Sequence, residues 1–218
     1  MKIYDISQEV FGCVVFPGDP APERIALKRI GNGDVCNLTA LSMCAHNGTH
    51  VDAPYHFIKD GKTIDEVSLD RWIGYAYVAA HHGPVSAQDA EEMLRRAKEA
   101  AQGYRDAHRA GEAGTSGAAC DAHLRILMKG KAYLTNEAAE VFAAHRILLF
   151  GNESQTVGPE DAPRQVHLTL LGAQVVLLEG IRLEEVPEGV YFLQAAPINL
   201  GGADGAPCRA TLIDWEDR

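Results

Sequence analysis

The stretch HNGTHVDAPYH, residues 46–56, places three imidazoles and a carboxylate within eleven residues. A helix is a poor interpretation, because Gly48 and Pro54 interrupt it and β-branched side chains flank His50. On extended backbone, side chains of one parity project to one side of the chain. The three imidazoles and the carboxylate all share one parity: His46, His50, Asp52 and His56.

A fully extended run of ten residues would span roughly 33 Å, which is too far for one site. The glycine and the proline let the chain bend and gather these side chains. His50 and Asp52 are about 6.6 Å apart along a strand, so both can reach one cation. Neutral imidazole and carboxylate suit zinc or another first-row divalent ion, and Asp52 can bridge two ions. The alternative is a polar loop whose histidines bond to backbone groups, but the shared parity favours a metal site.

Composition indicates one globular domain. The chain has 218 residues, of which 46% are hydrophobic and 23% charged. Thirty acidic against twenty basic residues give a net charge of −10, which disfavours nucleic acid and anionic membranes as partners. Five cysteines without a CxxC pair, and acidic residues near the N-terminus, indicate a reduced, cytoplasmic protein.

Periodicity predicts alternating strands and helices after residue 70 and a β-rich first third. The predicted strands are 2–6, 35–45, 72–80, 124–128, 146–150, 174–178, 190–193 and 209–213. The predicted helices are 86–102, 135–144 and 163–171. The glycine-rich segment 103–122 is expected to be a flexible surface insertion. Residues 201–207 are expected to form a backbone turn, with a loop near the site as the alternative, and Asp204 is assigned to the turn in preference to a substrate contact. The fold class is therefore an α/β sandwich with a mixed sheet.

The pattern H-x-G-T-H-x-D-x-P-x-H resembles the signature of the cyclase-like metal-dependent hydrolases, which include bacterial kynurenine formamidase and isatin hydrolase. The resemblance extends over nearly the whole chain except about residues 85–122. Further similar segments are Asp5-Ile6-Ser7, Pro17-Gly18-Asp19, 71–74, 135–154, 167–179 and 201–209. It implies a single swivelling β/β/α domain spanning 1–218.

The resemblance also implies roles for individual residues. One divalent metal would be held by His46, His50 and Asp52, and a second by Asp52, His167 and Glu179. His56 would be the catalytic acid/base, and Phe16 an aromatic substrate contact. Local pattern agrees at Glu179, which follows an apolar run and so ends a strand where α/β proteins build sites.

The implied activity is hydrolysis of a small amide, an arylformamide or a cyclic amide through a metal-activated water. One or two ions per chain are expected, zinc first and manganese as the alternative. The other interpretations are a cyclase or lactonase acting on a different carbonyl substrate, or a non-catalytic metal- or ligand-binding protein. The resemblance further implies a homodimer or a higher homo-oligomer. Kynurenine specificity does not follow, because residues 129–133 lead directly to the next helix, where formamidases carry an aromatic-rich stretch.

Overall fold

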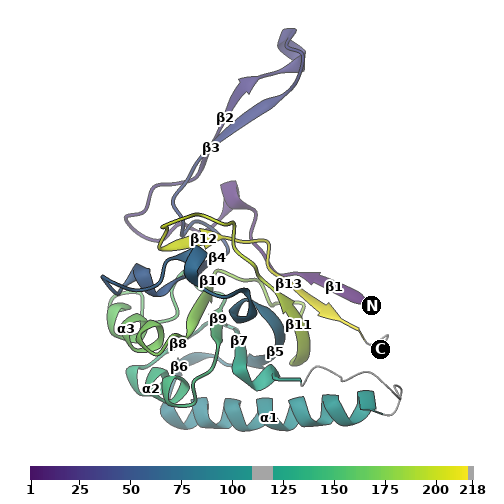
Figure 1. Ribbon diagram of the computed structural model, residues 1–218, viewed down its shortest axis with the longest axis vertical. Coiled ribbons are helices and arrows are strands. Elements are labelled where there is room, and N and C mark those ends of the chain that lie inside the picture. Colours follow the sequence, from purple (N-terminus) through teal and green to yellow (C-terminus); the bar gives the residue numbers. More distant parts are fainter. Residues whose placement is uncertain (110–119, 216–218) are drawn as a thin grey trace.

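Except for 35–45, the segments predicted as strands assemble into one sheet (Figure 1). The computed structural model describes residues 1–109 and 120–215, and within these residues nine strands form this sheet. In sheet order they are β1 (Lys2–Asp5), β13 (Thr211–Asp214), β11 (Gly189–Gln194), β5 (Ile73–Ala80), β7 (Arg125–Lys129), β9 (Leu149–Asn152), β10 (Val176–Glu179), β4 (His50–Asp52) and β12 (Gly205–Pro207). The predicted α/β fold with a mixed sheet is confirmed.

The centre of the sheet is parallel and its two margins are antiparallel. Strands β5, β7, β9 and β10 run parallel. Helices lie between them in sequence: α1 (Ala87–Arg109), α2 (Asn136–Ala144) and α3 (Arg164–Gly172). Such crossovers are what parallel neighbours require. Strand β4 joins this parallel block on its β10 side, so its side chains lie beside the carboxyl end of β10.

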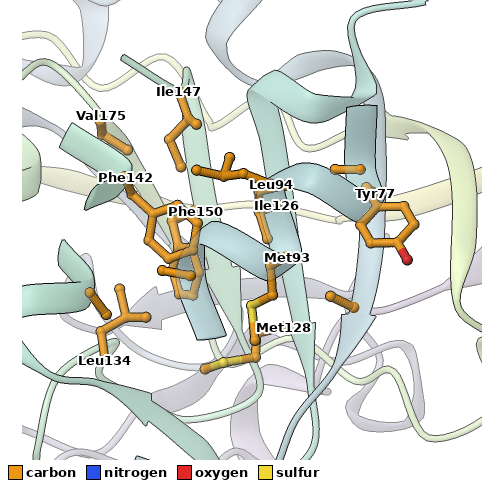
Figure 2. Packing of buried hydrophobic residues seen from close by; sticks show 14 of the residues in the cluster. Tyr77, Met93, Leu94, Ile126, Met128, Leu134, Phe142, Ile147, Phe150 and Val175 are labelled. Carbon is orange, nitrogen blue, oxygen red and sulfur yellow. The ribbon is translucent and has the colours of Figure 1, made fainter. Parts of the chain in front are cut away.

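Alternate side chains of the central strands enter two separate cores. Tyr77, Ile126 and Met128 pack with the three helices on one face (Figure 2). Val78 and Leu127 point to the other face, where they pack with Trp72 and with residues of the loops. Because both faces are covered, the central strands read as continuous apolar runs rather than as alternating ones.

The predicted helix starts agree with the observed caps. Thr135 Oγ1 accepts the amide of Ala138 at 3.2 Å, and Ser86 Oγ accepts that of Asp89, also at 3.2 Å. Helix α1 runs to Arg109 rather than ending at Gln102, and Tyr104 packs against the helix-side core. The expected insertion at 103–122 therefore begins as helix, and its part 110–119 lies outside the described residues.

Several elements were not predicted. Strand β2 (Glu23–Lys28) is one of them; it pairs with β3 (Leu38–Ser42), which lies within the predicted strand 35–45, as a two-stranded ribbon that projects away from the body (Figure 1). The side chains of β2 are all exposed, so no buried apolar run marked it in the sequence. Two further short strands, β6 (Gly83–Val85) and β8 (Ala132–Leu134), form another two-stranded sheet, and this one is parallel.

The prediction that 201–207 is only a backbone turn is wrong at its end. Gly205–Pro207 is strand β12 and pairs with β4, with Gly205 opposite Asp52. A strand of three residues is too short to show an alternating hydrophobic pattern, and its pairing with a distant segment cannot be read from local sequence. Among the described residues, none of the helices has the length and apolar character needed to span a bilayer.

Candidate metal and catalytic site

The site is built around β4, whose residues His50 and Asp52 are almost completely buried. Their i, i+2 spacing on a strand turns both side chains to the same side, as predicted. Strand β10 pairs with β4 so that Glu179 lies opposite His50, and Glu179 Oε2 is 3.4 Å from His50 Nε2. Two segments about 130 residues apart in sequence thus contribute to one cluster.

The remaining predicted ligands close around Asp52. His46 Nδ1 lies 3.0 Å from Asp52 Oδ1, and His167 Nε2 lies 3.8 Å from Asp52 Oδ2. His167, on α3, is also 3.2 Å from Glu179 Oε1. All five predicted ligands therefore converge in one buried cluster.

The structure also groups these residues differently from the predicted ligand sets. His50, Asp52 and Glu179 offer ligand atoms within 4.8 Å of one another, and so do His46, Asp52 and His56. Asp52 is common to both groups, which is the position that a bridging carboxylate would take.

Backbone carbonyls orient two of the imidazoles. His50 Nδ1 donates to the carbonyl of Gly48 at 3.0 Å, and His167 Nδ1 donates to that of Pro163 at 2.9 Å. Because a carbonyl can only accept, both rings carry their proton on Nδ1 and turn Nε2 toward the carboxylates. This is the outer arrangement that metal-ligating histidines use to fix their tautomer.

The approach of the loop to β10 depends on a glycine and a threonine. Thr49 Oγ1 donates to the carbonyl of Gly180 at 2.7 Å. Gly180 has φ +68°, and a Cβ built on it would lie 2.6 Å from the carbonyl oxygen of Gly48. Only glycine therefore permits this close packing beside Glu179.

The acidic groups raise the pKa of two buried imidazoles, His46 and His167, in the metal-free chain. Burial lowers the pKa of His46, but hydrogen bonds with Asp204 and Asp52 outweigh it and raise that pKa to about 11. In His167, burial is likewise outweighed, chiefly by Glu179, and the pKa rises to about 9. Burial opposes ionisation of Asp52, yet its neighbouring imidazoles lower its pKa. The cluster therefore neutralises its carboxylates with positive charge, which a bound cation would replace.

The residues present fit a divalent ion. Asp52 Oδ2 is buried and has no hydrogen-bond partner among the described residues. A buried carboxylate oxygen without a donor is uncommon in folded proteins unless a proton or a cation serves it. The donor set of imidazole nitrogen and carboxylate oxygen is the one that zinc and manganese accept.

His56 and Phe57 follow β4 on a short 3₁₀ turn, Pro54–His56. The His56 ring stacks on His46 with ring centroids 4.0 Å apart, and its side chain is 26% exposed. Phe57 stacks on His167 at 4.5 Å and meets His56 edge-on. The predicted acid/base thus lies at the solvent side of the cluster, with Phe57 as an apolar support that the sequence pattern did not single out.

Phe16 lies in a neighbouring cleft rather than in the cluster. The cleft has a volume of about 980 Å³ and is lined by Phe16, Tyr133, Gln155 and Arg182, among others. The predicted metal ligands and His56 do not line it. It adjoins the cluster through its wall at 156–158, where the Val157 amide donates to Glu179 Oε1 at 2.8 Å.

Asp204 is a site residue that the sequence pattern assigned to a turn. Its Oδ2 lies 2.8 Å from His46 Nε2 and 3.1 Å from His56 Nδ1. These hydrogen bonds lower the pKa of its carboxyl well below the ordinary range. Asp204 lies in a loop far from the histidine motif, so residue spacing gave no signal that it contacts His46 and His56.

Comparisons with known proteins give one consistent family. The family model described as "Putative cyclase" matches residues 4–159. The kynurenine formamidase of Paracidovorax citrulli is 34% identical over 214 residues, covering 96% of this chain and 95% of that protein. The kynurenine formamidase of Sphingopyxis alaskensis is 30% identical over 224 residues, covering 97% of each.

Solved structures share the fold along the whole chain. A potential metal-dependent hydrolase with cyclase activity superposes with a TM-score of 0.74 at 25% identity, covering 99% of this chain and 98% of that one. Isatin hydrolase A from Labrenzia aggregata, bound to benzyl benzoate, gives a TM-score of 0.74 at 19% identity, covering 99% and 94%. At that identity, the second comparison speaks for the fold alone.

Proposed function

The chain belongs to the cyclase family, and we propose that it is a metal-dependent hydrolase of a small amide, an arylformamide or a cyclic amide. The family resemblance predicted from the signature, and the prediction of an enzyme, are confirmed. The observation that carries the proposed function is the convergence on the buried Asp52 of possible ligand groups from three separate segments, which contribute His46, His167 and Glu179. The named activity of the formamidase relatives supports the amide class.

The ligands proposed from the motif are His46, His50, Asp52, His167 and Glu179. A divalent ion bound there would supply Lewis acidity and lower the pKa of a water from 15.7 toward about 7. Zinc is the first candidate and manganese the second, with one or two ions per chain, because mixed imidazole and carboxylate ligands suit both.

The chain's own residues would then position the reactants and move the proton. Hydrolysis adds water across the amide C–N bond, and the leaving nitrogen must gain a proton. We assign that transfer to His56, which lies beside His46 and is partly open to solvent. Phe16, in the adjoining cleft, is proposed to contact an aromatic part of the substrate.

The test is a substrate panel with metal control. The full chain would be assayed on N-formylkynurenine, isatin, simple amides and lactones, before and after chelation and after return of zinc or manganese. We expect amide hydrolysis that chelation abolishes and one of the two ions restores. Hydrolysis of lactones alone would favour the cyclase or lactonase alternative. Bound metal without any hydrolysis would indicate a binding protein.

We further propose that a second copy of this chain covers the β2–β3 ribbon. Its apolar side chains include Leu27 and Leu41, which are 58% and 61% exposed. A lone two-stranded ribbon is marginally stable in water, so such a surface needs a partner. Arg24, Lys28 and Arg29 line one side of the ribbon, whereas the chain as a whole carries a net charge of −10. The ribbon therefore suits the acidic surface of another copy.

We also propose that the protein works in a reducing compartment, the cytoplasm. All five cysteines are free, and Cys120 is buried. This is the state expected of a cytoplasmic enzyme.

A further inference from the structure

We propose that Asp204 is a positioning residue that holds both His46 and His56 in their working orientations through a single carboxylate oxygen. The inference rests on the proposed function for the roles of the two imidazoles. The contacts that carry it are independent of that function.

One oxygen atom reaches both rings. Asp204 Oδ2 lies 2.8 Å from His46 Nε2 and 3.1 Å from His56 Nδ1. The two rings stack with an interplanar angle of 28°, so their nitrogens face the same carboxylate from one side. Asp204 comes from the loop before β12, far in sequence from both histidines.

The backbone around Asp204 is tied to the same strand that carries the ligands. The Ala53 amide donates to the carbonyl of Asp204 at 2.9 Å, directly after β4. The Ile64 amide donates to the carbonyl of Ala203 at 2.9 Å, and the Gly202 amide donates to Asp65 Oδ1 at 2.9 Å. These hydrogen bonds fix the backbone of the loop. None of them uses the carboxylate of Asp204, which contacts the two imidazoles instead.

A shared acceptor selects the tautomer of each ring. An ionised carboxylate can only accept, so once a bound cation replaced the proton on Nδ1, neutral His46 would keep its proton on Nε2 and donate it to Asp204. His56 would carry its proton on Nδ1, which leaves its Nε2 as the atom that exchanges a proton with substrate. Asp204 thus acts on His46 as the backbone carbonyls of Gly48 and Pro163 act on His50 and His167. It also couples the orientation of the proposed acid/base to that of a ligand.

The experiment compares Asp204→Asn and Asp204→Ala with the matched control Asp65→Asn in the full chain. Asp65 is tied to the same loop, but its hydrogen bonds to Thr63 and Gly202 do not involve an imidazole. The first measurement is the ring-nitrogen NMR signal of His46 and His56 in the zinc-loaded chain, where ligation leaves His46 neutral, assigned with His56→Gln. We expect a single tautomer for each ring in the wild type and tautomer mixtures in Asp204→Ala.

The second measurement is zinc affinity, and the third is the separation of kcat from KM. We expect affinity and kcat each to fall roughly 10–100-fold in Asp204→Ala, the usual effect of losing an outer partner of a metal ligand. KM should change little, and Asp204→Asn, which keeps an acceptor oxygen, should lie between alanine and wild type. Asp65→Asn, whose side-chain oxygen can still accept from the Gly202 amide, should match the wild type.

Wild-type tautomers and zinc affinity in Asp204→Ala would overturn the proposal, as would equal losses in Asp65→Asn. If the wild-type chain hydrolyses none of the amides, the proposed function fails, but the NMR and zinc measurements still decide the role of Asp204.

Discussion

Glu179 on β10 lies directly opposite His50 on β4, and the pairing of these two strands sets the distance between their side chains. Because the register is antiparallel, Leu177 is opposite Asp52, and the acid at the end of β10 faces the imidazole at the start of β4. The sheet itself therefore assembles part of the candidate site. Substitutions at separate positions can distinguish metal ligation, proton transfer, loop packing, fold stability and assembly.

Asp52→Asn should remove most of the bound metal. Asp52 is the residue common to both groups of candidate ligands, and an amide keeps its shape while removing its negative charge. Loss of a hydrogen-bond partner of a metal ligand lowers metal affinity roughly 10–100-fold. We expect the loss of a ligand itself to lower zinc affinity by at least this factor. Elemental analysis of the purified variant checks this, and Asp70→Asn serves as an exposed control. Wild-type metal content in Asp52→Asn would remove Asp52 from the ligand set.

His56→Ala should keep its metal but lose turnover. Positioned acid/base groups contribute about 10²–10⁴-fold in rate, so kcat should fall by that factor. The variant's zinc content and its hydrolysis of N-formylkynurenine are measured on the same preparation. Loss of metal would instead identify His56 as a ligand, in keeping with its position beside His46 and Asp52.

Gly205→Ala should weaken metal binding through His46. A Cβ at position 205 would lie 2.6 Å from His46 Cε1 and 2.9 Å from the carbonyl oxygen of Val51, so the ring must move. We expect roughly 10–100-fold weaker zinc binding by titration. Gly201→Ala, in the same loop, is the matched control, since its Cβ would meet only Asp65 Oδ2 at 3.9 Å. Equal affinities in the two variants would contradict the expectation.

Arg125→Ala should destabilise the fold without touching the site. Arg125 is buried, and its guanidinium donates to the carbonyls of Arg71 and Tyr75, each at 3.2 Å, and to that of Asp70. Leaving these carbonyls unpaired should lower the free energy of unfolding by about 3 kcal/mol. Urea unfolding measures the loss.

The exposed Arg95, which pairs with Glu92 and Glu99 on its own helix, provides the control Arg95→Ala. Its unfolding midpoint should stay at the wild-type value. A midpoint for Arg125→Ala as high as that of Arg95→Ala would show that the buried guanidinium is dispensable.

Leu27→Glu should convert the assembly to monomers. A charge on the ribbon would have to be buried against the second copy, which is costly without a partner. Leu69→Glu is the matched control, because Leu69 is also 58% exposed but lies outside the ribbon. Light scattering after gel filtration gives the mass of each variant. A wild-type monomer, or a Leu27→Glu oligomer of unchanged mass, would refute the ribbon interface.

Local sequence pattern by itself determined the central strands, the helix starts and part of the proposed ligand set. Long apolar runs predicted the central strands, since segments covered on both faces need continuous hydrophobicity. Thr135 and Ser86 marked helix starts because capping is a local hydrogen bond. The parity of His50 and Asp52 predicted that they share one side of a strand, which is a property of extended backbone alone.

The tertiary structure decided what distant segments do to one another. It placed His167 and Glu179 against Asp52, turned residues 205–207 into a strand, and brought Asp204 between His46 and His56. Strand β2 likewise has no local signal, because its side chains are not buried within the chain, and its pairing with the predicted strand β3 appears only in the fold. Sequence patterns record how a residue relates to near neighbours through backbone periodicity. Pairings between remote strands and loops depend on how the packed elements meet, and only the folded chain specifies that.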